Sequence, residues 1–102
     1  MEKAKMDLEL SPSQIEILRR IVHGEILWQR ELPLVGAAAY FDNPPNEIEI
    51  VSAADVAVLE AGEGPELGLI EFRARGPGRA IAAEVTDLGT MYALRALRQL
   101  GR

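Results

Sequence analysis

The side chains that could carry chemistry in this sequence are arginines and carboxylates, because the chain has no cysteine and a single histidine, His23. Thiolate catalysis, disulfides and cysteine-based zinc sites are therefore excluded. A Ser-His-Asp arrangement would need Ser11, Ser13 or Ser52 beside His23, and none of these serines lies in a nucleophile motif. The glycine-rich stretches lack the lysine and the strand-to-helix context of a phosphate-binding loop. The sequence therefore predicts no enzyme, no cofactor and no metal site.

Three arginines, Arg73, Arg75 and Arg79, surround a glycine-proline-glycine turn. The residues on both sides of this turn alternate between apolar and polar, which predicts a β-hairpin with the arginines near its tip. Arginines in such a place can contact DNA phosphates, which gives salt-dependent affinity with little sequence discrimination. The alternative is that they lie on a solvated strand face and pair with Glu71 and Glu84 across the hairpin.

The charge of the chain is acidic overall and unevenly distributed. A net charge of −5 is a poor match to the basic footprint of nucleic-acid-binding domains. Residues 67–102 contain six arginines and three acidic residues, whereas residues 52–66 contain four acidic residues and no basic one. The helix expected in the second stretch has none of the Lys, Arg, Asn and Gln side chains that commonly read bases. Its acidic character favours a protein partner.

Capping signals predict three helices that would position these groups. A Ser-Pro-Ser-Gln capping box starts a helix over residues 11–23, and an extension of this helix to Glu31 is left open. A second helix is expected over residues 52–62, where Ser is the cap and Gly the end. Thr86 or Asp87 caps the last helix, whose alanine- and leucine-rich side is either core or a dimer seam.

Between these helices the sequence predicts three strands and leaves one segment open. Residues 32–41 have the composition of a short buried helix, although the fold of the whole segment 32–46 is left open. Residues 47–51 alternate glutamate and isoleucine, which predicts a half-buried strand. Residues 69–75 and 79–86 alternate in the same way and form the two strands of the hairpin.

The aromatic residues Trp28, Tyr40 and Phe41 flank the segment that is hardest to predict. The favoured interpretation is that all three fill the core beneath a long loop. The alternative is a patch that binds a partner, because aromatic side chains are enriched at the centres of protein interfaces.

Three stretches resemble the winged helix-turn-helix family. LSPSQIEILRRI is similar to its first helix, and VSAADVAVLEAG with the following LGLIEFR is similar to its second helix and first wing strand. GRAIAAEVTDLGTMYALRAL is similar to the second wing strand and the start of the terminal helix. The resemblance implies an α+β winged helix-turn-helix domain over residues 11–102, with a helical core and a C-terminal β-hairpin wing followed by a terminal helix. Residues 1–10 are expected to be a flexible N-terminal segment.

The resemblance and the charges lead to two hypotheses. The first is a DNA-binding, transcriptional-regulator-like protein that contacts double-stranded DNA mainly through Arg73, Arg75 and Arg79. The second is an acidic winged-helix interaction module that binds a protein partner and not DNA. A homodimer is expected in both, because a chain with only 5% aromatic residues has a thin core that shared burial would supplement. The lack of cysteine and of any apolar run near ~20 residues favours a cytoplasmic protein without a membrane association.

Overall fold

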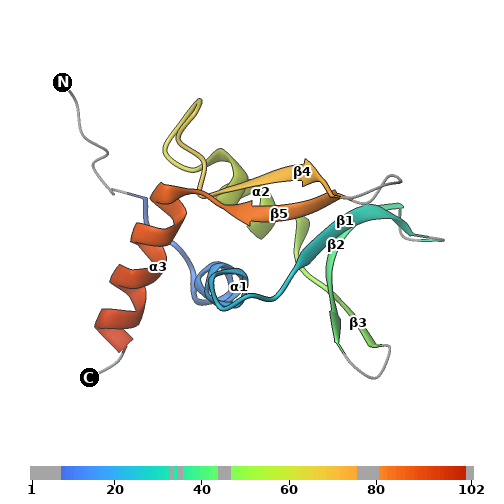
Figure 1. The fold of residues 1–102 in the computed structure, drawn as a ribbon, viewed down its shortest axis with the longest axis horizontal. Coiled ribbons are helices and arrows are strands. Elements are labelled where there is room, and N and C mark those ends of the chain that lie inside the picture. The colour runs from blue at the N-terminus through green and yellow to red at the C-terminus, as the bar shows by residue number, and fades with distance from the viewer. Residues whose placement is uncertain (1–7, 33, 35, 44–46, 76–80, 101–102) are drawn as a thin grey trace.

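The computed structural model of the protein describes residues 8–32, 34, 36–43, 47–75 and 81–100. Its elements, in chain order, are α1 (Pro12–Val22), β1 (Leu27–Leu32), β2 (Gly36–Asn43), β3 (Glu47–Ile50), α2 (Ala53–Ala61), β4 (Ile70–Ala74), β5 (Ile81–Val85) and α3 (Asp87–Leu100). The strands form one antiparallel sheet in the order β3-β2-β1-β5-β4 (Figure 1). The two outer strands, β3 and β4, each pair with one neighbour in the part of the chain that is described.

Helices α1 and α2 begin at the serine caps that the sequence predicts. Ser11 accepts a hydrogen bond from the Gln14 N–H at 3.3 Å, and the Gln14 side chain accepts one from the Ser11 N–H at 2.9 Å. Ser52 accepts from the Asp55 N–H at 3.4 Å. The Asp55 carboxylate accepts from Ser13 at 2.8 Å and from Gln14 at 3.0 Å, so it joins the starts of α1 and α2. These caps satisfy backbone groups that a helix start leaves unpaired.

The start of α3 explains the Thr-Asp-Leu-Gly sequence that leads into it. The Thr86 hydroxyl accepts from the Gly89 N–H at 3.0 Å and donates to the Gly68 carbonyl at 2.6 Å. A Cβ atom at position 89 would lie 2.0 Å from the Leu69 carbonyl oxygen, so glycine is required by this close approach. Thr86 thus caps α3 and fastens it to the segment that enters β4.

Tyr92 of α3 joins three segments of the chain. Its hydroxyl accepts from the Leu8 N–H at 3.0 Å and donates to the Glu63 carboxylate. Burial, together with the hydrogen bond to Glu63, raises the pKa of Tyr92 to about 12. The start of the described chain and the loop after α2 are therefore both held against α3.

One face of the sheet packs against all three helices and forms the main core. The cluster contains, from the sheet, Leu27, Ala39, Phe41, Ile70 and Ala83, from the helices, Ile17, Leu18, Ile21, Val56, Leu59, Leu88, Tyr92 and Ala93, and also Leu69. Because side chains alternate along a strand, the residues between these sheet positions point to the opposite face. One row of them crosses every strand: Ile50, Tyr40, Trp28, Ala82 and Arg73.

The predicted winged helix-turn-helix fold is wrong. Instead of a helical core with a C-terminal wing, the protein has three helices packed on a five-stranded antiparallel sheet. The segment 32–41, expected to be a buried helix, provides the end of β1 and most of β2, and the open extension of α1 to Glu31 is strand as well. Gly24 with φ of 102° lies just beyond α1, where the chain turns toward β1.

The physical reason for this error is strand pairing, which the alanine-rich composition of the segment does not show. β1 and β2 pair over six residues, and β1 also pairs with β5, more than fifty residues later in the chain. Tertiary contacts of this kind override the helical preference of an alanine-rich segment. The predictions that depend on local signals are confirmed, namely α1 to about His23, a strand at β3, helix α2, the two strands β4 and β5, and helix α3. The expected half-burial of β3 is wrong, because all four of its residues are exposed.

Candidate protein-binding edge of the sheet

Two of the three predicted DNA-contacting arginines, Arg73 and Arg75, lie in and just after strand β4. Arg73 on β4 has a side chain that is 60% exposed, and it lies 3.1 Å from the Glu71 carboxylate and 4.0 Å from that of Glu84. Glu71 and Glu84 are the two partners expected if the arginines lie on a solvated strand face and do not contact DNA. Arg75 is exposed just after β4, and Arg79 lies outside the described residues. Contact between DNA and these three arginines therefore stays a prediction.

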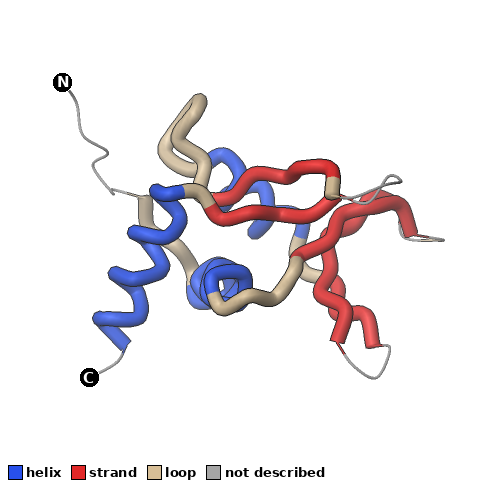
Figure 2. The backbone as a smooth tube through the Cα atoms, in the orientation of Figure 1, coloured by secondary structure: helices blue, strands red, loops and turns tan. Residues whose placement is uncertain are grey.

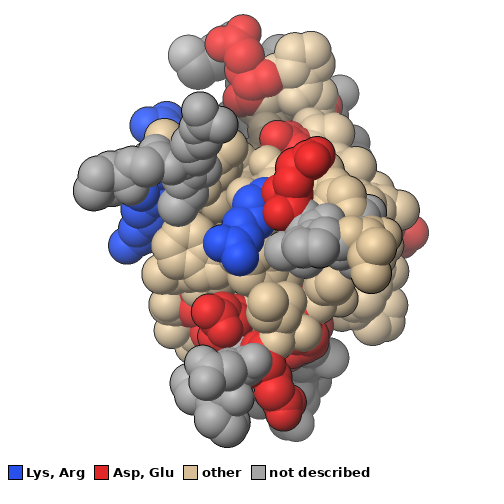
Figure 3. All heavy atoms as spheres, turned by 90° about the vertical axis from the view of Figure 1, so that its right-hand side faces the viewer, with Lys and Arg blue, Asp and Glu red and all other residues tan. Residues whose placement is uncertain are grey.

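The surroundings of the hairpin are mixed in charge. A hollow of about 1130 Å³ lies between the loop after α2, strand β4 and the start of α3. Its lining includes the carboxylates Glu60, Glu66, Glu71 and Asp87, and no Lys or Arg is among the described residues that line it. Among the described residues, Figure 3 shows basic and acidic side chains side by side on one face, without one continuous basic strip in that view. Carboxylates so close to the arginines would face DNA phosphates of like charge.

Strand β3 is the most solvent-exposed strand of the sheet. All four of its residues are exposed, and β3 lies at the end of the molecule away from α3 (Figure 2). Ile48 and Ile50 are each 49% exposed and point to the face opposite the main core. Glu47 and Glu49 point to the other face. We call these four residues the β3 surface.

The backbone of β3 also has N–H and C=O groups with which no described residue pairs. The Val51 N–H donates to the Ala39 carbonyl at 3.0 Å, which continues the β2–β3 ladder by one residue pair. Directly opposed pairs in an antiparallel ladder alternate between hydrogen-bonded and non-hydrogen-bonded. Glu49, opposite Phe41, therefore bonds toward β2, whereas the N–H and C=O groups of Ile48 and Ile50 point away from the sheet.

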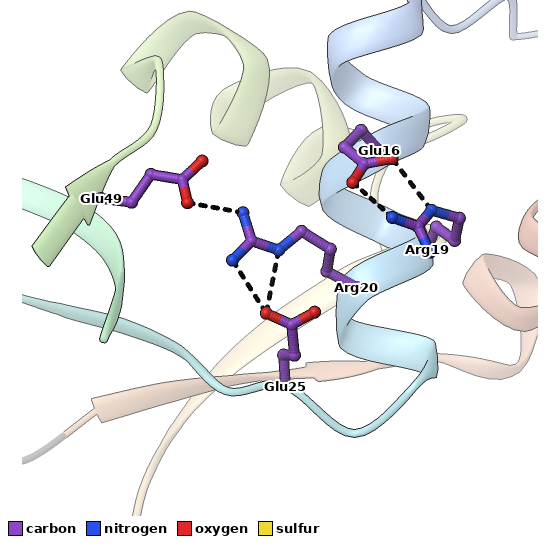
Figure 4. A network of polar contacts seen from close by, with 5 residues as sticks. All are labelled: Glu16, Arg19, Arg20, Glu25 and Glu49. Carbon is purple, nitrogen blue, oxygen red and sulfur yellow. Dashed lines mark hydrogen bonds and ion pairs between the residues drawn. The ribbon is translucent and has the colours of Figure 1, made fainter. Parts of the chain in front are cut away.

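Arg20 of α1 fixes β3 relative to the body of the protein (Figure 4). Its guanidinium lies 2.8 Å from the Glu25 carboxylate, 3.0 Å from the Glu49 carboxylate and 3.8 Å from the centre of the Phe41 ring. The side chain of Arg20 is only 12% exposed. Hydrogen bonding to Glu25 raises the pKa of Arg20 against the opposing effect of burial. The arginine therefore holds Glu49 on the core side and leaves the two isoleucines on the outer face.

The outer face continues the apolar surface inward from β3. Ile50 lies opposite Tyr40, and Tyr40 lies opposite the half-buried Trp28. The guanidinium of Arg30 lies 5.8 Å from the centre of the Tyr40 ring, within the range of a cation–π contact. Tyr40 is 5% exposed but does not belong to the main core cluster. The apolar row thus crosses three neighbouring strands, but its accessible parts are the exposed Ile50 and the half-buried Trp28.

The three aromatic residues that were expected to fill the core together are separated. Phe41 is in the core, whereas Tyr40 and Trp28 lie on the outer face. Because Tyr40 and Phe41 are adjacent, a strand must direct them to opposite faces. That signal is present in the sequence but is useful only once residues 36–43 are known to form a strand.

Neither a metal site nor a membrane span emerges from the described part of the chain. Within residues 8–32, 34, 36–43, 47–75 and 81–100, no three His, Cys, Asp or Glu side chains come together as potential metal ligands. No helix within these ranges has the length and apolar character needed to cross a membrane.

Comparison of the chain with protein-family models, curated proteins and solved structures gives no match. Its function must therefore be argued from its own geometry.

Proposed function

We propose that the chain is a protein-interaction module that binds a partner protein through the β3 surface. The observation that carries this proposal is the half exposure of Ile48 and Ile50 on a strand whose outer edge is unpaired among the described residues. Soluble proteins commonly protect such edges, because free N–H and C=O groups beside apolar side chains attract another chain. On the same face the half-buried Trp28 adds aromatic surface of the kind that supports binding interfaces, whereas Tyr40, between Ile50 and Trp28, is 5% exposed and is not available to a partner.

Contact with double-stranded DNA is a second proposal, favoured by a specific observation. Arg30 and Arg73 belong to the same outer face of the sheet, and both are exposed, as is Arg75 near the hairpin tip. Three phosphate contacts would give affinity that falls steeply with salt. The ion pairs of Arg73 and the nearby carboxylates weaken this proposal relative to the first.

Site-specific photocrosslinking in cells that make the protein tests the first proposal. A photoreactive amino acid in place of Ile48 is expected to give a discrete crosslinked protein, whereas the same group in place of Ala57, exposed on α2, is not. The added change Ile50→Lys should remove the product while circular dichroism stays unchanged. Equal crosslinking from both positions would contradict the proposal.

A salt titration of binding to duplex DNA tests the second proposal. Fluorescence anisotropy of a labelled duplex should show affinity at low ionic strength that Arg73→Glu and Arg75→Glu together abolish. An absence of binding at low salt would exclude DNA contact by this chain.

A further inference from the structure

The backbone of β3 can accept another strand. The N–H and C=O groups of Ile48 and Ile50 point away from β2, two residues apart, which is the spacing at which an added strand forms its ladder bonds. Extended peptides bind other proteins in this way, with backbone bonds supplying affinity and alternate side chains supplying specificity.

The side chains of β3 define what such a strand would carry. On one face, Ile48 and Ile50 offer apolar contacts, and on the other Glu47 and Glu49 offer negative charge. Glu49 already pairs with Arg20 at 3.0 Å, while Glu47 is exposed and makes no ion pair with any described residue. Directly opposed side chains share a face, so a matching strand places apolar residues beside the isoleucines and basic residues beside the glutamates.

The β3 strand of a second copy does not meet these requirements, because Glu47 and Glu49 are its charged residues and it has no basic residue to place beside them. Antiparallel pairing of two β3 strands about Ile48 would place Glu47 of each copy opposite Glu49 of the other, and pairing about Glu49 would place the two Glu49 residues opposite each other. Like charges directly opposite are destabilising. The charge pattern therefore favours a different chain.

We infer that the partner contributes an extended segment in which basic residues alternate with apolar ones, and that this segment adds to β3 as a sixth strand. The inference rests on the proposed function of the β3 surface and specifies its ligand. Glu47 and Glu49 account for the basic residues of the segment. The N–H and C=O groups of Ile48 and Ile50 that point away from β2 account for its pairing.

Three synthetic peptides test the charge pattern with the purified full chain. The first alternates lysine and valine, the second alternates glutamate and valine, and the third has the composition of the first with lysines and valines in separate blocks. Fluorescence anisotropy should show that the first binds about tenfold more tightly than either of the others, from the summed effect of a few cross-strand pairs. Equal binding of the block peptide would show unspecific charge attraction and overturn the inference, as would no binding up to millimolar peptide.

A charge exchange locates the site. Glu47→Lys should reverse the preference, so that the glutamate-valine peptide binds more tightly than the lysine-valine peptide. The matched control is Glu60→Lys, which makes the same charge change at an exposed position on α2 and should leave the preference unchanged. An equal effect of both variants would overturn the inference, and circular dichroism checks that both are folded.

Backbone methylation tests strand addition itself. Methylating every second amide nitrogen of the lysine-valine peptide should abolish binding in one of the two alternating sets and spare the other, because only one set faces β3. Equal effects of the two sets would contradict strand addition. A crosslink at position 48 without peptide discrimination would overturn the inference and leave the proposed function standing, and a crosslinked product of two copies of the chain would also overturn the inference. If neither the crosslinking at position 48 nor the peptide binding gave the expected result, both the proposed function and the inference would be contradicted.

Discussion

The two edges of the sheet solve the same physical problem differently. On its outer face β4 carries Glu71 and Arg73, and Arg73 pairs with Glu71 at 3.1 Å and with Glu84 of β5 at 4.0 Å. β3 carries charge on one face only and exposes Ile48 and Ile50 on the other. Charged side chains along an edge discourage pairing with other chains. The difference teaches that β4 is a protected edge and β3 an edge suited to a partner.

The largest effect on the free energy of unfolding is expected from replacing the phenylalanine that lies next to each edge, Phe41 of β2 and Phe72 of β4. Phe41 of β2 is 1% exposed, whereas Phe72 of β4 is only partly buried. Phe41→Ala should lower the free energy of unfolding by about 3–5 kcal/mol, because it removes a fully buried ring and leaves a cavity. Phe72→Ala should cost less, about 1–3 kcal/mol. Urea denaturation measures both, and equal losses would contradict the burial difference between the two sides.

A smaller effect on the free energy of unfolding is expected at alkaline pH from Tyr92 of α3, which lies in the core behind both edges of the sheet. The pKa of Tyr92 is about 12 in the folded protein, against an ordinary value of 10.0. The unfolded chain loses this proton first, so the contribution of Tyr92 is complete below pH 10 and falls between pH 10 and pH 12. The loss should amount to about 2–3 kcal/mol. Denaturation across this range measures it, and Tyr92→Phe should flatten this part of the profile; an unchanged slope would contradict the assignment.

The arginines of the two edges allow a matched comparison. Arg20 is 12% exposed beneath β3, and Arg73 is 60% exposed on β4. Arg20→Met should lower the free energy of unfolding by about 1–3 kcal/mol, because it leaves Glu25 and Glu49 without their shared cation. Arg73→Met should change it by less than about 1 kcal/mol, because exposed ion pairs contribute little. Thermal and urea denaturation of the two variants decide, and the reverse order would refute the role of Arg20.

The smallest effect on stability is expected where the effect on binding is largest. Ile48→Lys places a charge on the outer face of β3 and should change the free energy of unfolding by about 0.5 kcal/mol or less. The same change should remove the crosslink from a photoreactive group at position 50. Glu71→Lys is the corresponding change at β4 and should leave that crosslink intact. Loss of the product in both variants would contradict the distinction between the edges.

The homodimer expected from the sequence stays a prediction. Helix α3 exposes Met91 and Leu94 by 49% and 52%, on the helix that the sequence proposes as a seam. Sedimentation equilibrium should show a dimer that Met91→Glu and Leu94→Glu together dissociate. A wild-type monomer at high concentration would exclude this arrangement.

What could be predicted from the sequence depends on local signals. Ser11, Ser52 and Thr86 are caps in the structure because a cap involves only residues a few positions away. Strands β1 and β2 differ from the expectation because the composition of residues 32–41 favours a helix, whereas pairing of β1 with β2 and with β5 makes them strands. The exposure of Ile48 and Ile50 also depends on how the strands pair. The alternation of glutamate and isoleucine predicts that β3 is a strand, but the strand order β3-β2-β1-β5-β4 places it at the edge of the sheet.

The order of the strands also has a consequence for how the protein is made. β1, β2 and β3 pair in succession, and all of them precede β4 and β5 in the chain. Among the described residues, β1 meets β5 through two residue pairs, Trp28 with Ala82 and Gln29 with Ile81. Pairing of neighbours along the chain closes short loops and is fast, whereas the later seam must close a long one. During synthesis, the edge that we propose for partner binding is therefore expected to emerge from the ribosome before the strands that complete the sheet.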